Sequence, residues 1–393
     1  MKKRKICIIT TSRADYGILS RLMKEIQDDF DLKLQVIVSG MHMEKKFGLT
    51  YSSIAGDGFT IDEKINMLMT ADTAVGICTS IGTGFREFAK ALQRLQPDIM
   101  VVLGDRYELL PAVVSALIAR IPIAHIHGGE TSQGAIDEAI RHSITKMSAL
   151  HFPCAEEYKK RIIQLGENPK YVFNYGAPGL DAFLALQLFE KPQLEDALRF
   201  DLNGKLALAT YHPATLDSKS PLSQIRSMLA AIKRIDIKVV FTMANADTGG
   251  NVVNTEIRNF CRLNRRQYRF CPNLGQKLYF SCMKNFDVMV GNSSSGIIEA
   301  PLFKIPVVNV GDRQKGRLRS PNIIDVSCTA DAITHGLRRS LQHDFRKGLR
   351  NIKSPYLKYF DGKTSYRIKE KLKRVILGDK MLKKEFRDII FTV

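Results

Sequence analysis

The residues best suited to chemistry in this chain are acidic groups that stand beside basic ones between positions 103 and 142. Asp105 lies in the segment LGDR, Glu130 closes HIHGGE, and Asp137 lies in IDEAIRH. Carboxyl groups gathered in one place separate their pKa values, so that one accepts a proton while a neighbour keeps one. The pattern predicts proton-transfer chemistry, although ordinary solvated loop and helix-end charges would give the same letters.

Two of these acids follow apolar runs that are typical of buried strands. IMVVL precedes Asp105 and IPIAHI precedes Glu130. Both acids should therefore lie just past the carboxyl ends of strands, where open α/β sheets bind their ligands. Asp137 and Arg141 are four residues apart and should share one face of a helix. We expect the three acids to converge on one edge of a sheet.

Strand-like and helix-like segments alternate along the chain. The expected strand segments are 5–10, 32–40, 99–104, 121–126, 205–210, 237–242, 286–291 and 305–310, and the expected helices are 13–26, 87–95, 109–120 and 135–150. This rhythm predicts parallel, doubly wound sheets with right-handed crossovers, and 393 residues are too many for one ordinary core.

We therefore expect an α/β protein with two Rossmann-like domains that face a central cleft. A stretch rich in Gly and Pro at 174–183 marks the hinge. The domains are placed at 1–178 and 179–365, and a helical segment at 366–393 is expected to pack back on the first domain.

Composition is that of a globular protein, with 45% hydrophobic and 25% charged residues. The opening MKKRK leads into an apolar stretch that is too short for a secretory signal, and the longest apolar region, 109–126, is interrupted by Pro111, Arg120 and Pro122. These features predict a cytoplasmic protein without a membrane anchor. The seven cysteines form no CxxC pair, which is typical of reduced thiols.

The charge balance raises the question of a polyanionic partner. Lys and Arg number 59 against 40 Asp and Glu, a formal charge of +19. Many of the basic residues alternate with apolar ones near the C-terminus, as on a solvated amphipathic helix. They lack an aromatic stacking series, and the chain shows no helix-turn-helix or zinc-finger spacing. We expect a small anionic substrate and no nucleic acid.

Several residues of the C-terminal half could hold a diphosphate. In GNSSSG at 291–296 a strand ends and a short helix opens, so that backbone N–H groups and the hydroxyls of Ser293 and Ser294 could bind an anion. Simple N-capping by serine is the alternative. Glu299, one turn further on, could accept hydrogen bonds from ribose hydroxyls.

Basic side chains near other strand ends could complete a nucleotide site. Arg13 and Arg313 offer a forked guanidinium, and His212 in the segment YHP could donate to a leaving diphosphate. The loop after the first strand, TTSRADYG, lacks the GxGxxG spacing of dinucleotide-binding proteins, and we expect no NAD.

Eight segments together resemble the hydrolysing UDP-N-acetylglucosamine 2-epimerases of bacterial sialic and legionaminic acid pathways. The segments are TSRADYG, SGMH, LGDRYE, HIHGGE, DEAIRHSITKMS, ANADTGG, GNSSSGIIE and NVGDRQKGR, and they span nearly the whole chain. The resemblance implies a glycosyltransferase-B-like fold, no metal, no redox cofactor and a homodimer. One local difference is Leu103, where some relatives carry histidine.

The resemblance also assigns site residues. It implies that Asp105, Glu130 and Asp137 are catalytic acids, and we add His212 to the catalytic set for its proposed contact with the leaving group. It implies nucleotide contacts for Arg13, His212, Asn245, Ser293, Ser294, Glu299 and Arg313. His42, Arg106 and Arg141 stand in the similar segments, and we expect them to bind substrate.

The chemistry of such an enzyme explains the need for these groups. The hydrogen on C2 of a sugar nucleotide becomes acidic only as the C1–O bond breaks, so the site must stabilise the departing diphosphate. Anti elimination of UDP gives 2-acetamidoglucal, and hydration with inversion at C2 gives the manno sugar. The expected substrate is UDP-N-acetylglucosamine, and UDP-N,N'-diacetylbacillosamine is the alternative.

Two other classes stay open at this stage. A glycosyltransferase of the same fold would pass the sugar to an acceptor, but it would not need three acids beside C1. A non-catalytic sensor of sugar nucleotides or a module that binds polyanions would rest on the excess of basic residues alone.

Overall fold

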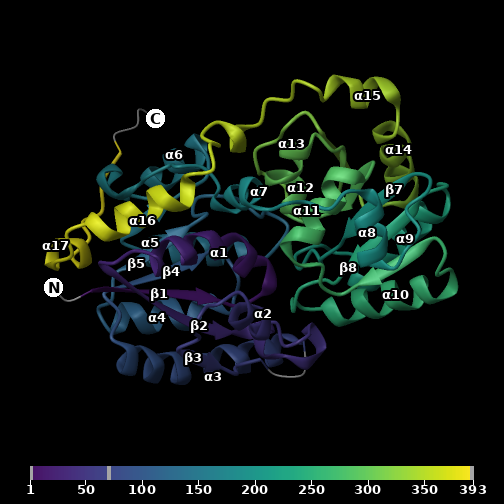
Figure 1. Ribbon diagram of the computed structural model, residues 1–393. Coiled ribbons are helices and arrows are strands. Elements are labelled where there is room, and N and C mark those ends of the chain that lie inside the picture. Colours follow the sequence, from purple (N-terminus) through teal and green to yellow (C-terminus); the bar gives the residue numbers. More distant parts are fainter. Residues whose placement is uncertain (1–2, 69–71, 390–393) are drawn as a thin grey trace.

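The computed structural model describes residues 3–68 and 72–389 and shows two lobes, each built on one parallel sheet (Figure 1). In spatial order the first sheet contains β3 (Glu63–Ile65), β2 (Leu32–Ser39), β1 (Arg4–Thr10), β4 (Ile99–Leu103), β5 (Ile123–Ile126) and β6 (Leu150–Phe152). The second contains β12 (Ile323–Val326), β11 (Val307–Val310), β10 (Val288–Gly291), β7 (Leu206–Thr210), β8 (Lys238–Thr242) and β9 (Tyr268–Cys271). Counted within each lobe, both sheets have the same doubly wound order, in which ligands bind at the carboxyl edge.

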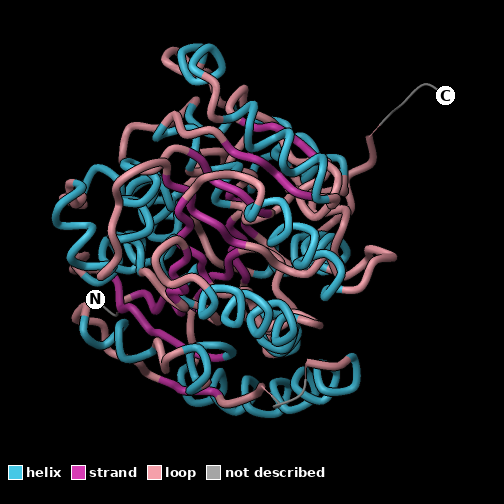
Figure 2. Tube along the Cα trace, turned by 90° about the vertical axis from the view of Figure 1, so that its right-hand side faces the viewer, coloured by secondary structure: helices cyan, strands magenta, loops and turns pink. Residues whose placement is uncertain are grey.

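Helices cover both faces of each sheet, so the strands lie at the centre of each lobe (Figure 2). The first lobe contains α1 (Arg13–Gln27), α2 (Tyr51–Gly56), α3 (Ala74–Leu95), α4 (Leu109–Ile118), α5 (Asp137–Met147) and α6 (Glu156–Gln164). The second contains α8 (Lys191–Leu198), α9 (Pro221–Lys233), α10 (Gly250–Leu263), α11 (Gly275–Asn285), α12 (Ser295–Ile298), α13 (Ala300–Phe303), α14 (Ala330–Ser340) and α15 (His343–Gly348). The short helix α7 (Asp181–Ala185) follows the first lobe, and α16 (Thr364–Arg374) and α17 (Asp379–Leu382) come last. Among the described residues, no helix combines the length and apolar character needed to cross a membrane.

The strands form where the sequence has continuous apolar runs, because a parallel sheet is buried on both faces. Every residue of β4 and β7 is buried. Separate apolar clusters pack on the two faces of each sheet. Where β10 ends, Gly291 has φ +132° and a Cβ there would lie 1.9 Å from the carbonyl oxygen of Thr210. Only glycine allows the backbones to approach so closely at this edge.

All eight predicted strand segments are strands, and the prediction of two Rossmann-like domains is confirmed. The edge strands β3, β6, β9 and β12 were missed because they are only three or four residues long. Helix α3 begins at Ala74, well before the predicted residue 87. Its glycines obscured the helical pattern, yet Gly84 has a packing role, since a Cβ there would lie 2.8 Å from Pro111 of α4.

The chain returns to the first lobe near its C-terminus, where α16 lies against α1 (Figure 1, yellow and purple). Ile368 and Leu372 enter the apolar cluster of the first lobe. Arg4 Nη1 donates hydrogen bonds to the carbonyl oxygens of Leu372, Lys373 and Val375 at 2.7, 2.7 and 2.9 Å. The last described helices therefore complete the lobe that the first strand begins.

Candidate functional site

A cavity of about 320 Å³ lies between the carboxyl edges of the two sheets. Twelve of the thirteen site residues predicted from the sequence line it: Arg13, Asp105, Arg106, Glu130, Asp137, Arg141, His212, Asn245, Ser293, Ser294, Glu299 and Arg313. The tertiary structure thus brings residues from position 13 to position 313 of the chain together on one surface. The first lobe contributes the carboxyl groups expected to act on the sugar, and the second contributes most of the groups expected to bind the nucleotide.

His42 is the thirteenth, and the structure does not bring it to the cavity. Its Nε2 lies 3.0 Å from the hydroxyl of Thr10, and its Nδ1 lies 2.8 Å from the hydroxyl of Thr50. The ring is fully buried, and burial lowers its pKa to about 3, helped by the charge of Arg13. We therefore interpret His42 as a neutral residue that ties β1 to the segment after β2.

Asp105 follows β4 and is held by α5. Arg141, one turn after the start of that helix, forms an ion pair with its Oδ2, and the hydroxyl of Ser132 donates to the same oxygen at 3.3 Å. Arg141 is almost fully buried, and its Nη1 also donates to the backbone oxygen of His127 at 2.9 Å. Because its partners are fixed in the first lobe, Asp105 reaches the cavity in one orientation.

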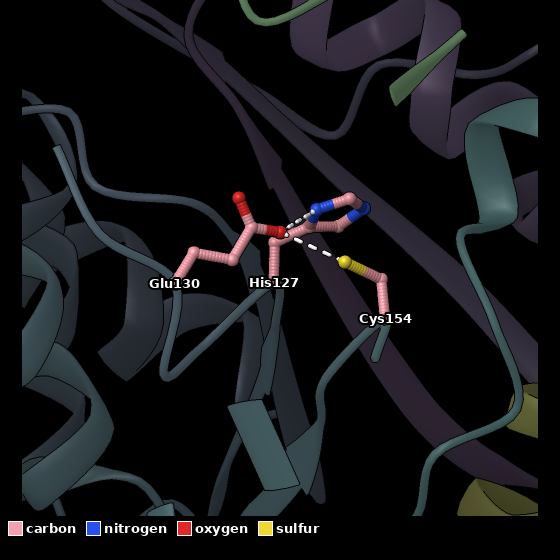
Figure 3. A group of neighbouring side chains, drawn as sticks. All are labelled: His127, Glu130 and Cys154. Carbon is pink, nitrogen blue, oxygen red and sulfur yellow. Dashed lines mark hydrogen bonds and ion pairs between the residues drawn. The ribbon is translucent and has the colours of Figure 1, made fainter. Parts of the chain in front are cut away.

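Glu130 accepts hydrogen bonds at one carboxyl oxygen and faces two guanidinium groups at the other. His127 Nδ1 and Cys154 Sγ lie 2.5 and 3.0 Å from its Oε1 (Figure 3), and Arg317 Nη2 lies 3.0 Å from its Oε2. Burial alone would raise the pKa of this carboxyl, but Arg317, His127 and Arg141 together lower it well below its ordinary value. Glu130 is therefore a fixed negative charge that ties the lobes together.

His127, Glu130 and Cys154 also offer three ligand atoms within 4.8 Å of one another, the geometry of a possible metal site. Two observations disfavour a cation there. Arg317 and Arg141 both face the Glu130 carboxylate, at 3.0 and 3.8 Å. Burial and the charge of Glu130 raise the pKa of the Cys154 thiol, whereas a metal would need a thiolate. The trio fits a hydrogen-bonded carboxylate better than a metal centre.

Asp137 is the first residue of α5, and its surroundings favour the protonated form of its carboxyl group. Burial raises its pKa from 3.8 to about 7, and the negative charges of Asp105 and Asp247 act in the same direction. Arg313 and Arg106 oppose this shift. A carboxyl group that titrates near neutral pH can give or take a proton at low energetic cost, as acid–base catalysis requires.

His212 lies at the end of β7 in the opposite wall of the cavity. Its Nδ1 accepts a hydrogen bond from the backbone N–H of Asn245 at 3.1 Å, and its own backbone N–H donates to Asn292 Oδ1 at 2.7 Å. Burial lowers the pKa of this imidazole well below its ordinary value, and Arg313 and Arg106 lower it further. A neutral ring that accepts at Nδ1 carries its proton on Nε2, which makes it a donor towards a bound anion.

Serine hydroxyls follow β10 in the same wall. Ser293 Oγ lies 2.8 Å from Ser295 Oγ, and Tyr279 OH lies 2.6 Å from the latter. Ser294 directly precedes α12, and no side-chain capping hydrogen bond is present there. Its hydroxyl is thus not used as a cap. Arg313 Nη1 donates to the backbone oxygen of Asn292 at 3.2 Å, and its Nε has no hydrogen-bond partner among the described residues.

Glu299 stands at the break between α12 and α13. It is 8% exposed, and its Oε2 is buried without a hydrogen-bond partner among the described residues. Burial raises the pKa of this carboxyl to about 7. A buried carboxyl with free acceptor capacity in a cavity wall is suited to a ligand that brings hydroxyl donors.

The lobes meet through the loop between Glu130 and α5. Gly134 lies so close to the loop after β11 that a Cβ would be 2.7 Å from the carbonyl carbon and oxygen of Asp312. The backbone N–H of Ile136 donates to Thr215 Oγ1 at 3.1 Å, and Arg317 Nε donates to the Thr131 backbone oxygen at 2.9 Å. The acids at both ends of this loop are therefore positioned by contacts with the second lobe.

The sequence reasoning missed three cavity or boundary residues, Arg317, Tyr279 and Asp247. Arg317 and Asp247 stood inside the quoted segments NVGDRQKGR and ANADTGG, which was a usable signal. Nothing in the local sequence around Tyr279 pointed to the site.

Comparisons with known proteins agree with one another. Residues 24–373 match the sequence model of a family described as UDP-N-acetylglucosamine 2-epimerase. The chain is 45% identical to the GDP/UDP-N,N'-diacetylbacillosamine 2-epimerase (hydrolyzing) of Campylobacter jejuni, over 83% of this chain and 85% of the relative. It is 36% identical to the UDP-N,N'-diacetylbacillosamine 2-epimerase (hydrolyzing) of Legionella pneumophila, over 97% and 98%. The solved UDP-GlcNAc 2-epimerase of Neisseria meningitidis bound to UDP-GlcNAc has the same fold, with a TM-score of 0.77, 18% identity and 94% and 99% coverage.

Proposed function

This chain belongs to the UDP-N-acetylglucosamine 2-epimerase family, and from that premise we propose that it hydrolyses a UDP-2-acetamido sugar with inversion at C2, releasing UDP. The observation that carries the proposal is the division of the cavity. Three carboxyl groups in distinct environments line one side, and uncharged donors with a guanidinium line the other. An elimination that breaks C1–O while removing the C2 proton needs both sides at once.

In the first step the second lobe stabilises the departing diphosphate. His212 Nε2–H, the hydroxyls of Ser293 and Ser294 and the Arg313 guanidinium supply donors and one positive charge. Because a diphosphate is already a good leaving group, stabilising its charge contributes more than a strong acid would. Glu299 accepts from the ribose hydroxyls, and Arg13 and Asn245 complete the nucleotide site.

In the same step Asp105 removes the C2 proton, and the product is 2-acetamidoglucal. Asp105 is the more exposed of the acids, with 17% of its side chain accessible, and its orientation is fixed by Arg141. Asp137 then protonates C2 from the opposite face while water adds to C1, and the proton lost by that water and the proton held by Asp105 pass to solvent. Glu130, which is enclosed by donors, stabilises positive charge that develops on the sugar ring.

Two donor sugars were expected from the sequence, and two observations favour UDP-N,N'-diacetylbacillosamine over UDP-N-acetylglucosamine. The relatives at 45% and 36% identity carry that substrate in their names. Ile18, Met41, Phe47 and Leu103 also give the first-lobe wall an apolar surface. Such a wall suits the methyl group of a 6-deoxy sugar, whereas the C6 hydroxyl of N-acetylglucosamine would lose hydration there. The product would then supply legionaminic-type synthesis, and with the other donor it would be N-acetylmannosamine for sialic-type synthesis.

The experiment is incubation of the purified protein with each UDP-sugar in D₂O without an acceptor. We expect free UDP and a manno-configured product that carries deuterium at C2, with the larger kcat/KM for the diacetylated donor. Protium retained at C2, or UDP release that depends on an added acceptor, would identify a glycosyltransferase. A larger kcat/KM for UDP-N-acetylglucosamine would reverse the assignment of the donor.

A further inference from the structure

A second and much smaller cavity lies behind Asp137. Its volume is about 10 Å³, and both lobes line it. Asp137 lines this cavity and the large one, so it is shared between the substrate space and the small space. Asp247, Thr215 and Thr248 of the second lobe provide polar atoms around it. A space of this size with several polar partners is at the lower limit for holding one water molecule.

Asp247 reaches this place across the boundary between the lobes. It is 7% exposed, and its Oδ1 lies 3.4 Å from Arg106 Nη1. The same guanidinium binds Glu108 more closely, with Nη2 2.7 Å from Oε1. Arg106 is therefore shared between two carboxyl groups and does not fully neutralise Asp247. The hydroxyl of Tyr107 donates to the Ala246 backbone oxygen at 3.4 Å, which holds the adjacent part of the loop.

The charged groups that face Asp137 come from several elements. Asp105 after β4 and Asp247 after β8 are negative, and Arg313 after β11 and Arg106 after β4 are positive. On its own helix, Arg141 is already paired with Asp105. Asp247 is the only negative group in this set that the second lobe delivers, and it is not needed to bind either end of the substrate in the proposed reaction.

We propose that Asp247 is a positioning residue that acts through Asp137: when the lobes face one another, its carboxylate and one water in the small cavity hold a proton on Asp137 for delivery to the sugar. This inference rests on the proposed function and deepens it. Each turnover moves one proton from C2 to Asp105 and one from Asp137 to C2, and the water that adds to C1 releases another. Asp105 must therefore lose its proton, and Asp137 must regain one. The small cavity lets Asp137 regain its proton from a side that the product, still bound in the large cavity, does not block.

The test compares Asp247→Asn, which removes the charge at constant shape, with Asp247→Glu, which keeps it. The measurement is the pH dependence of kcat for UDP release. In the wild type, activity is expected to fall on the alkaline side as Asp137 loses its proton. With Asp247→Asn the midpoint of that fall should move to lower pH by on the order of one unit, while Asp247→Glu stays near the wild-type midpoint. An unchanged midpoint in Asp247→Asn, or an equal shift in both variants, would overturn the proposal.

A second measurement is independent of turnover. The carboxyl carbon signal of Asp137, identified by its loss in Asp137→Asn, can be followed by NMR through a pH titration of the UDP-bound protein. It should titrate at lower pH in Asp247→Asn than in the wild type. Should that variant fail to fold, Asp247→Ser takes its place. If the titration of Asp137 shifts but no UDP-sugar is hydrolysed, the proposed function fails and the link between Asp137 and Asp247 stands. If UDP-sugars are hydrolysed but the titration of Asp137 does not shift, the proposed function stands and the role proposed for Asp247 fails.

Discussion

The three acids of the first lobe reach one cavity in three different electrostatic environments. Asp105 is paired with Arg141, Glu130 is enclosed by donors, and Asp137 is raised to a pKa of about 7 by burial and like charges. Neighbouring carboxyl groups with separated pKa values can divide the roles of base and acid at one pH. We therefore assign the donated proton to Asp137.

Replacement of Asp137 by asparagine is predicted to lower kcat by at least about 100-fold, because the amide cannot release the proton that C2 receives. UDP binding should stay within about threefold of wild type, because the nucleotide contacts lie in the second lobe. Steady-state assays of UDP release and a titration with UDP check both parts. Ser143→Ala is the control on the same helix, since Ser143 is exposed and does not line the cavity. Full activity in Asp137→Asn would contradict the assignment of the donated proton to Asp137.

The same substitution should raise stability at alkaline pH. Since the folded protein raises the pKa of Asp137 from 3.8 to about 7, it binds this proton more tightly than the unfolded chain does. The free energy of unfolding therefore decreases as pH rises between these values and is lowest, for this group, above pH 7. Asp137→Asn should melt roughly 2 °C above wild type at pH 8 and gain less at pH 5. Calorimetry at both pH values checks this, and an equal gain at both would contradict it.

The proposed contact between Glu299 and the ribose hydroxyls can be tested directly. Glu299→Ala is predicted to weaken UDP binding about 10- to 100-fold, the loss of one or two hydrogen bonds to a charged acceptor. The wild type should discriminate against 2'-deoxy-UDP by a similar factor, and the variant should not. Calorimetric titration with both nucleotides gives the four affinities. Discrimination that persists in the variant would place the ribose elsewhere.

At the scale of elements, helix α5 connects the chemistry to the rest of the fold. Its first residue is Asp137, and Lys384 donates to the backbone oxygens of Lys146 and Ser148 at its other end, at 2.7 and 2.6 Å. Helix α16 precedes this contact and packs on α1. We propose that residues 366–389 function as part of the first lobe, with the remaining boundary near 178. The last four residues of the expected segment 366–393 lie outside the described part of the chain.

That proposal predicts the effect of Leu372→Ala in α16. Leu372 is fully buried in the cluster of the first lobe, so its truncation should reduce the free energy of unfolding by about 2 to 5 kcal/mol. Urea unfolding followed by circular dichroism measures the change. Leu382→Ala, at a position that is 36% exposed, is the control and should cost less than about 1 kcal/mol. Equal effects of the two substitutions would argue against the assignment of α16 to the first-lobe core.

At the scale of the whole molecule, the outer face of α3 carries little charge along one stripe. The stripe contains Val75, Cys78, Gly82, Phe85 and Ala89, all exposed, with the alternating spacing of three and four residues that two packed helices share. A Cβ on Gly82 would meet nothing within 4 Å. We propose that this stripe meets its copy in a homodimer, because the spacing is self-complementary and the glycine allows close approach.

Gly82→Arg should therefore convert a dimer to a monomer. The inserted side chain would place two positive charges at the centre of the contact. Sedimentation velocity at micromolar concentration distinguishes the two states, and Gln93→Arg, which adds the same charge to an exposed polar position of the same helix, should remain dimeric. A dimer that survives Gly82→Arg would place the interface on another face.

The sequence by itself determined the two sheets and most of the cavity wall. Continuous apolar runs specify buried parallel strands, and polar residues directly after such runs must gather at the carboxyl edge, which is how Asp105, Glu130 and His212 were found. Short edge strands and the glycine-containing start of α3 carried too weak a local pattern. Only the tertiary structure decided that His42 does not line the cavity, and that Asp137 differs from Glu130 in its affinity for a proton. The physical reason is that a pKa depends on burial and on charges within a few ångströms, and here those charges come from loops more than a hundred residues apart.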